Sequence, residues 1–199
     1  MKNEMIQDFG YSEMYEWYEV PQPEFRLGRF VTFSKNDSTK IVPVSKEDQF
    51  IIGVSTINSA FDSDDPDEWK YKNMCNEYGD LYLTEEKLAV GTKTYDQLNE
   101  INFIRTYPWK HLVKIENKLY DKTKKYVKRS NREEWVRVNL MGKVIVFDDG
   151  KCKPGEWCKP YTGKMKELQG SAVPANENDK QKFYVMCRLS AKTIVILNK

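Results

Sequence analysis

Alternation of hydrophobic and polar positions is the strongest pattern along this chain, and it predicts short β-strands. Turn-forming residues separate the runs, and the last two are joined by a loop of hairpin length. Short strands with regular turns favour an antiparallel barrel or sandwich, so the predicted fold class is mainly β. The runs that fit this pattern are residues 28–33, 40–44, 49–55, 134–140, 142–147, 182–189 and 193–197.

Helical patterns are few, and they predict one or two short helices. Residues 65–70 place a proline and several acids where a helix would begin. The following residues, 69–78, have the spacing of a short helix. Residues 98–103 fit neither pattern clearly.

The length and composition favour one sizeable domain. The chain has 199 residues, of which 40% are hydrophobic, enough for a packed core. We predict an N-terminal tail at 1–9 and a β domain over 10–199, with an irregular basic insertion at about 84–132. No apolar run approaches the roughly 20 residues of a membrane-spanning helix. The N-terminus lacks a secretory signal, so synthesis in a host cytoplasm and no membrane association are expected.

The charge is distributed unevenly. Residues 1–104 carry 10 Lys and Arg against 20 Asp and Glu, while residues 105–199 carry 22 against 10, so balances of −10 and +12 combine to +2. Such polarity can steer encounters with a partner, or let one copy dock the acidic part of another. Solvated loops and faces are the simpler interpretation.

The cysteines and the single histidine indicate neither a metal site nor a cofactor. Cys152 and Cys158 are the closest pair, but five residues separate them, a wider gap than in zinc-binding hairpins. His111 is the only histidine and cannot support a metal cluster. We expect free thiols, no metal and no cofactor.

One basic stretch has a residue pattern that could contact nucleic acid. Residues 118–129 interleave tyrosines with cations that could neutralise phosphates, while the aromatic rings could stack on bases. A solvated basic loop is the favoured interpretation, because no recognised nucleic-acid fold surrounds the stretch. The candidate binding residues are Lys122, Lys124, Lys125, Lys128 and Arg129.

Carboxylates are the remaining candidates for catalysis. Glu13, Glu16 and Glu19 are spaced by three among aromatic residues. A carboxylate pressed against aromatic surface is desolvated, which raises its pKa and suits it to acid–base work on an amide. The same spacing is also typical of the solvated face of a strand.

Several ordered segments resemble the intramolecular-chaperone autoproteolytic cleavage domain, a self-cleaving glutamic peptidase family of phage tail-spike and neck-appendage proteins with giant-virus relatives. The resemblance covers essentially residues 10–198. The matching segments are residues 11–17, 26–32, 51–55, 68–79, 129–143, 148–154 and 184–196.

This resemblance implies a domain that assists trimeric folding and then cuts itself free before an Asp-Tyr-Ala-Glu-like motif. The family's glutamate aligns with Glu13, but its aspartate aligns with Gly10 and the small residue before the bond aligns with Phe9. A two-acid mechanism therefore lacks one partner. Cutting before Gly10 would also release only nine residues, and because the chain starts at a Met we expect no upstream fibre for it to fold.

The sequence thus predicts a viral or prophage structural protein on the chaperone-domain fold, without the usual self-cleavage. It is expected to form a homotrimer and to bind other virion proteins, as an appendage or minor capsid component of the virion. One alternative is an active peptidase in which Glu13, with Asp8, Glu16 or a distant acid, cleaves near residues 9–10. A nucleic-acid-binding module through residues 118–129 is the third hypothesis.

Overall fold

The protein is mainly β and antiparallel, which confirms the predicted fold class. The computed structural model describes residues 14–21, 27–46, 50–56, 68–69, 72–88, 93–96, 101–104 and 109–198. Helical structure in these ranges consists of two three-residue 3-10 helices, Arg129–Asn131 and Lys166–Leu168. No helix in the described part of the chain is long and apolar enough to span a membrane.

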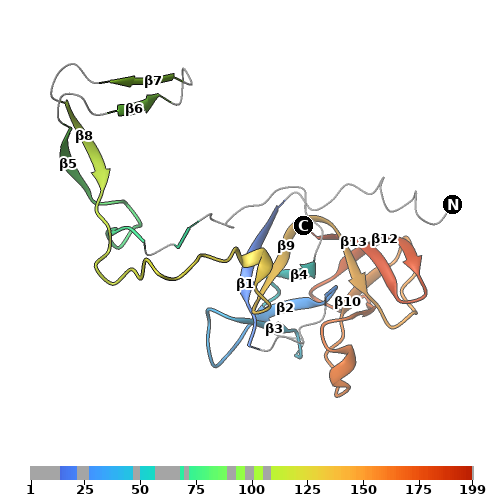
Figure 1. Ribbon diagram of the computed structural model, residues 1–199. Coiled ribbons are helices and arrows are strands. Elements are labelled where there is room, and N and C mark those ends of the chain that lie inside the picture. The colour runs from blue at the N-terminus through green and yellow to red at the C-terminus, as the bar shows by residue number, and fades with distance from the viewer. Residues whose placement is uncertain are drawn as a thin grey trace. The chain divides into compact units, whose positions relative to one another are not determined.

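Internal contacts divide the chain into two units. A main unit comprises Met1–Asp65 and Val127–Lys199, and a second unit comprises Pro66–Tyr126. Most strands of both are labelled in Figure 1.

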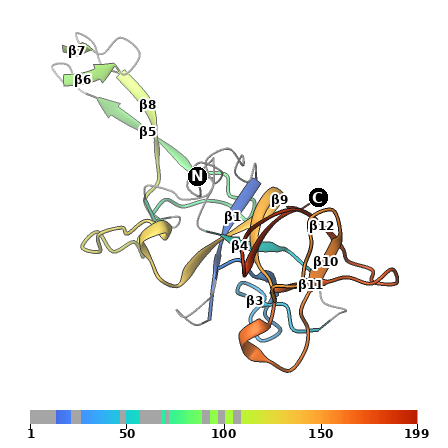
Figure 2. The same cartoon turned by 90° about the vertical axis from the view of Figure 1, so that its right-hand side faces the viewer.

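A curled antiparallel sheet, a half-barrel, forms the main unit (Figures 1 and 2). Its strand order is β11-β10-β12-β13-β9-β4-β2-β3, and β1 also pairs with β9. The strands are β1 (Met14–Glu19), β2 (Phe30–Phe33), β3 (Ile41–Pro43), β4 (Gly53–Thr56), β9 (Trp135–Phe147), β10 (Trp157–Pro160), β11 (Ala172–Pro174), β12 (Phe183–Ser190) and β13 (Thr193–Asn198).

The long strand β9 connects the two halves of this sheet. The sequence pattern predicts two strands here, 134–140 and 142–147, whereas the structure has one strand of 13 residues. Gly142, between them, has a φ of 99°, a conformation that is costly for residues with a Cβ atom. Glycine therefore lets β9 continue through the point where its partner changes from β1 to β13.

The strands β1 and β13 lie end to end along one edge of β9. Asn198, the last residue of β13, is opposite Gly142, and Met14, the first residue of β1, is opposite Met141. The other edge of β9 carries β4 and the chain around Gly28, whose carbonyl accepts the Phe147 N–H. The described start of the predicted cleavage segment therefore enters the sheet where the C-terminal strand ends.

Two clusters of buried side chains form the core of the main unit. The first lies over β12, β13 and the second half of β9, and includes Phe30, Val146, Val185 and Ile196. The second packs Val31, Ile41 and Val138 beneath β2, β3 and the first half of β9. Each such side chain contributes about 1.5–3 kcal/mol through burial, so alternation along the strands determines which face turns inward.

The predicted helix at 69–78 is wrong wherever this stretch is described. Asn73 forms an antiparallel bridge with Glu116, and Cys75 forms one with Leu81. The Asn76 side-chain oxygen accepts the backbone N–H groups of Tyr78 and Asp80 at 2.9 Å. Asparagine side chains that bond the local backbone in this way compete with helix formation and favour turns.

The second unit consists of two-stranded ribbons. Its strands are β5 (Leu83–Leu88), β6 (Lys93–Asp96), β7 (Ile101–Ile104) and β8 (Trp109–Lys114), with β5 paired to β8 and β6 to β7. These strands differ from the irregular segment expected at 84–132. Residues 83–87 are all exposed, so no alternation between a buried and a solvated face marks β5 in the sequence.

Candidate functional site

The predicted cleavage site lies outside the described residues. This applies to Glu13, to Gly10 at the family's aspartate position, and to Asp8 and Phe9. The assignment of Glu13 as a catalytic residue therefore stays a prediction. What the structure does describe is the strand that follows, β1, and the part of the sheet that receives it.

The two later glutamates of this segment make surface contacts. Glu16 is exposed and accepts a hydrogen bond from the Tyr18 hydroxyl at 2.8 Å. Burial, and then this hydrogen bond, raise the pKa of Tyr18 well above its usual value. Glu19 lies 3.0 Å from the Lys40 ammonium. Both carboxylates are thus engaged in surface contacts, Glu16 on the exposed face of β1 and Glu19 at the end of the strand.

The aromatic residues of β1 anchor the strand to the sheet. Tyr15 and Trp17 lie on either side of Glu16 along β1 and are 3% and 7% exposed. Arg137, on the neighbouring strand β9, lies over both rings, with centroid distances of 5.5 Å and 4.7 Å. Burial and cation–π contact together fix β1 on β9. The aromatic–acidic pattern is therefore explained, over these residues, by a half-buried strand.

A buried pair of amides lies where β1 enters the sheet. The Asn198 side-chain nitrogen donates to the backbone oxygen and to the side-chain oxygen of Asn139, at 3.1 Å and 3.0 Å. The Asn139 side-chain nitrogen donates to the Met141 carbonyl at 2.9 Å. Asn139 is opposite Tyr15 in the register of β1, and Met141 is opposite Met14. These bonds hold the backbone of β9 at the point where β1 begins.

Sequence reasoning did not identify this amide pair. Asn139 is a polar residue inside a valine-rich strand, and a buried polar side chain must find partners within the protein. An asparagine among valines in a predicted strand therefore indicates a buried polar contact. Its partner Asn198 lies 59 residues further on and is not marked by any local pattern.

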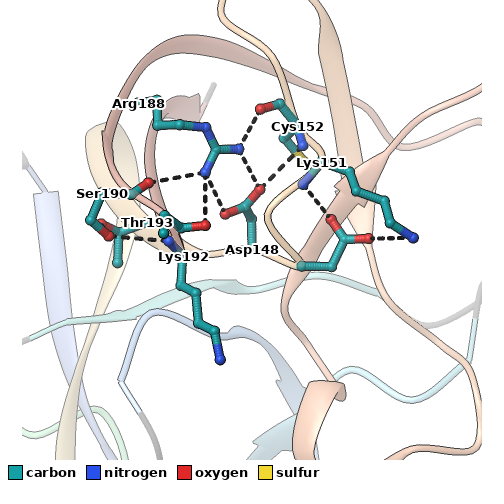
Figure 3. Close-up of polar contacts among 9 residues, drawn as sticks. Asp148, Lys151, Cys152, Arg188, Ser190, Lys192 and Thr193 are labelled. Atoms are coloured by element: carbon teal, nitrogen blue, oxygen red, sulfur yellow. Dashed lines mark hydrogen bonds and ion pairs between the residues drawn. The ribbon is translucent and has the colours of Figure 1, made fainter.

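A second buried polar cluster ties the turn after β9 to the β12–β13 hairpin (Figure 3). The Asp148 carboxylate is fully buried and accepts two hydrogen bonds from the Arg188 guanidinium, at 3.1 Å and 2.7 Å, and one from the Cys152 N–H at 3.2 Å. Arg188 also donates to the Cys152, Ser190 and Ala191 carbonyls. Its contacts with Asp148 raise the pKa of Arg188. The cluster links segments 40 residues apart.

The same turn brings potential metal ligands together. Asp148, Asp149 and Cys152 each offer a ligand atom within 4.8 Å of the others. Both oxygens of Asp148 already accept hydrogen bonds from the cationic Arg188, which disfavours a metal ion at this position. These residues therefore act as a structural ion-pair cluster.

The cysteine thiols are free. Cys152 and Cys158 are both buried, and hydrogen bonding between the two thiols, followed by burial, raises the pKa of Cys152. Burial also raises the pKa of Cys187. The thiolate is the reactive form of cysteine, and a raised pKa keeps the thiol protonated. Cys152 and Cys187 are therefore poorly suited to act as nucleophiles.

The single histidine belongs to the second unit. The Nε2 atom of His111 lies 3.4 Å from a Glu86 carboxylate oxygen across the β5–β8 ribbon. This cross-strand contact gives His111 a structural role.

The residues of the basic stretch fall in two different environments. Lys122, Lys124, Lys125 and Lys128 are exposed, whereas Arg129 is 9% exposed and its guanidinium lies 4.2 Å from the Trp135 ring centroid. Lys122 also lies 2.6 Å from the Glu116 carboxylate. The boundary between the units falls after Tyr126, so Lys128 and Arg129 belong to the main unit. Nucleic-acid binding by this stretch stays a prediction.

Comparisons with known proteins agree with the fold and with the predicted family. The Peptidase_G2 family model, the IMC autoproteolytic cleavage domain, matches residues 4–186. The crystal structure of the pre-mature bacteriophage phi29 gene product 12 is similar, with a TM-score of 0.65 and 22% identity over 95% of this chain. The C-terminal fragment of the same phi29 protein gives a TM-score of 0.62 and 21% identity, and the alignment covers 94% of this chain and 100% of the fragment.

The two kinds of match cover different shares of the proteins compared. The chain spans 22% of the length of the pre-mature phi29 protein, so that likeness concerns the fold of one part. No curated protein matches the chain. The family match covers nearly the whole sequence and includes β1, the amide pair residue Asn139 and the Asp148 turn. The chain therefore belongs to the Peptidase_G2 family of IMC autoproteolytic cleavage domains.

Proposed function

We propose that this protein is a virion structural and assembly protein of a virus or prophage, which self-associates as a trimer and no longer cleaves itself. It binds other virion proteins as part of an appendage or as a minor capsid component. Membership of a family of intramolecular-chaperone domains supports the assembly role. A fold alone does not determine function, so the proposal depends on features of this chain.

The exposed apolar side chains of the second unit are the observation that carries the proposal. Leu83 on β5 and Leu112 on β8 are 50% and 64% exposed, and Leu119 and Tyr78 are 91% and 83% exposed. An isolated two-stranded ribbon is marginally stable in water, and clusters of exposed apolar residues usually mark protein interfaces. Burial against other copies of the chain would supply the missing core.

Self-association is tested by the mass of the protein in solution. Analytical ultracentrifugation at micromolar concentration is expected to give three times the chain mass of 23.5 kDa. The double substitution Leu83→Ser and Leu112→Ser is expected to shift the protein to the monomer, because it removes apolar surface from the ribbon. Met165→Ser is the matched control, since Met165 is 59% exposed in the main unit. A wild-type monomer, or equal effects of both variants, would contradict the proposal.

The loss of self-cleavage has its own test. Gly10 provides no carboxylate where the family's aspartate aligns, so we expect the purified protein to keep its full-length mass after long incubation. Restoring the family pattern with Phe9→Ser and Gly10→Asp is expected to produce cleavage before residue 10. Intact-mass spectrometry measures both.

The control for this experiment is Glu13→Gln. In the restored variant it is expected to abolish cleavage, because it removes the remaining carboxylate of the aligned motif. Loss of residues 1–9 from the wild-type protein, abolished by Glu13→Gln, would instead establish the active peptidase.

A further inference from the structure

A row of four side chains crosses one face of the sheet in the main unit. It consists of Trp157 on β10, Tyr184 on β12, Leu197 on β13 and Lys143 on β9, and these strands are neighbours in this order (Figures 1 and 2). The register places each of the four directly opposite the next. At the usual spacing of strands the row is about 14 Å long. None of the functions considered so far uses it.

Alternation along the strands explains why this row faces solvent. The residue next to each member of the row belongs to the first core cluster; these neighbours are Cys158, Val185, Ile196 and Val144. Successive side chains of a strand point to opposite faces, so the row lies on the face turned away from this cluster. Trp157 and Tyr184 are 50% and 40% exposed. Exposed Trp and Tyr side chains on a rigid sheet are typical anchors of a protein interface.

The two aromatic rings form a corner rather than a flat platform. Their centroids are 5.6 Å apart and their planes meet at 74°. A sugar ring or a nucleotide base stacked across both rings would need nearly coplanar planes. The Trp157 indole N–H and the Tyr184 hydroxyl have no hydrogen-bond partner within the described part of the chain, so both can donate to a ligand. The corner therefore suits a ligand with compact apolar groups and hydrogen-bond acceptors.

The backbone beneath the row is already paired. Strands β10, β12 and β13 each have a neighbouring strand on both sides, so a partner cannot bind here by adding a strand. A proline-rich segment binds in a different way, because its rings pack on aromatic side chains and its carbonyls accept hydrogen bonds from them. Its preformed conformation also lowers the ordering cost of binding.

The other end of the row carries a positive charge. Lys143 is exposed and forms no ion pair with any residue that the structure describes. Leu197 lies between it and the aromatic corner. A polyproline segment advances about 3.1 Å per residue, so about five residues span the row. An acidic residue at the end of such a segment would meet the Lys143 ammonium, and the two charges are complementary.

We propose that this row binds an extended, proline-containing segment of another virion protein. The prolines pack against Trp157 and Tyr184, and an acidic residue of the segment pairs with Lys143. The proposal rests on the proposed binding of other virion proteins. It depends neither on trimer formation through the second unit nor on the loss of self-cleavage.

Fluorescence anisotropy of a labelled peptide with the full chain tests this proposal. The probe contains five prolines with a glutamate at each end, so that either direction of binding brings an acid to Lys143, and saturable binding is expected. Trp157→Ala is expected to weaken binding at least about tenfold, because it removes the main anchor and a donor. Lys143→Gln is expected to weaken it about threefold at low salt and less at high salt, because the charge is exposed and screened.

Phe33→Ala is the matched control, because Phe33 is also 40% exposed but lies on β2. It is expected to change binding less than about twofold. A peptide with glycine and serine in place of proline is expected not to bind. Equal binding of that peptide, or equal effects of Trp157→Ala and Phe33→Ala with unchanged circular dichroism spectra, would overturn the proposal.

Two further outcomes would also contradict it. Binding of a neutral oligosaccharide, maltohexaose, in place of the proline peptide would assign the row to a different class of ligand. Absence of saturable peptide binding to a protein that ultracentrifugation shows to be trimeric would overturn this proposal and leave self-association intact.

Discussion

Replacing Gly53 with alanine is expected to prevent stable folding of the main unit. Gly53 begins β4, where it pairs with Val31 on β2. A Cβ atom at this position would lie 2.0 Å from the Asn139 carbonyl oxygen and 2.9 Å from its carbonyl carbon. Both atoms belong to the backbone of β9, so no side-chain rotation relieves the clash. The cost is expected to reach or exceed the ~3 kcal/mol of severe overpacking, a large part of a typical total stability of about 5–15 kcal/mol.

Thermal and urea unfolding followed by circular dichroism measure this effect. Gly155→Ala is the matched control: Gly155 has a φ of 85°, but no atom lies within 4 Å of its Cβ position. Its substitution carries only the cost of the left-handed conformation, about 1–2 kcal/mol. If Gly53→Ala destabilised the protein no more than Gly155→Ala, the close approach of β4 and β9 would not be the constraint at residue 53.

Removing the buried carboxylate of Asp148 is expected to give the second large effect. Asp148→Ala leaves the Arg188 guanidinium without its carboxylate and the Cys152 N–H without its acceptor. Breaking one side of a buried ion pair typically lowers the free energy of unfolding by about 3–5 kcal/mol. The loss should loosen the turn after β9 together with the β12–β13 hairpin, because the ion pair joins them.

The neighbouring acid provides the control. The Asp149 carboxylate lies 3.7 Å from the exposed Lys151 ammonium and accepts a hydrogen bond from the Lys151 backbone N–H. Asp149→Ala is therefore expected to lower the free energy of unfolding by about 1 kcal/mol or less. A double-mutant cycle with Arg188→Met should show a coupling energy within the usual range of about 0.5–3 kcal/mol for residues in contact. Equal destabilisation by Asp148→Ala and Asp149→Ala would mean that the ion pair contributes little.

Local sequence patterns predicted the strands of the main unit better than those of the second. Residues 182–189 and 193–197 match β12 and β13 within one residue at each end, because one turn and alternating burial define this hairpin. The β5–β8 ribbon was not predicted, since residues 83–87 of β5 are all exposed and show no alternation. The spacing of residues 69–78 predicts a helix, whereas Asn76 begins a turn there, and both Asn76 and Gly79 are residues typical of turns.

By itself, the sequence determined the β class, most strand positions in the main unit and the family, because alternation and ordered motifs are local properties. Only the tertiary structure decided that β1 and β13 meet end to end along β9, that Asn139 pairs with Asn198, and that Asp148 pairs with Arg188. These features join residues far apart in the chain, and their pairing depends on the registers of the complete sheet rather than on any local pattern.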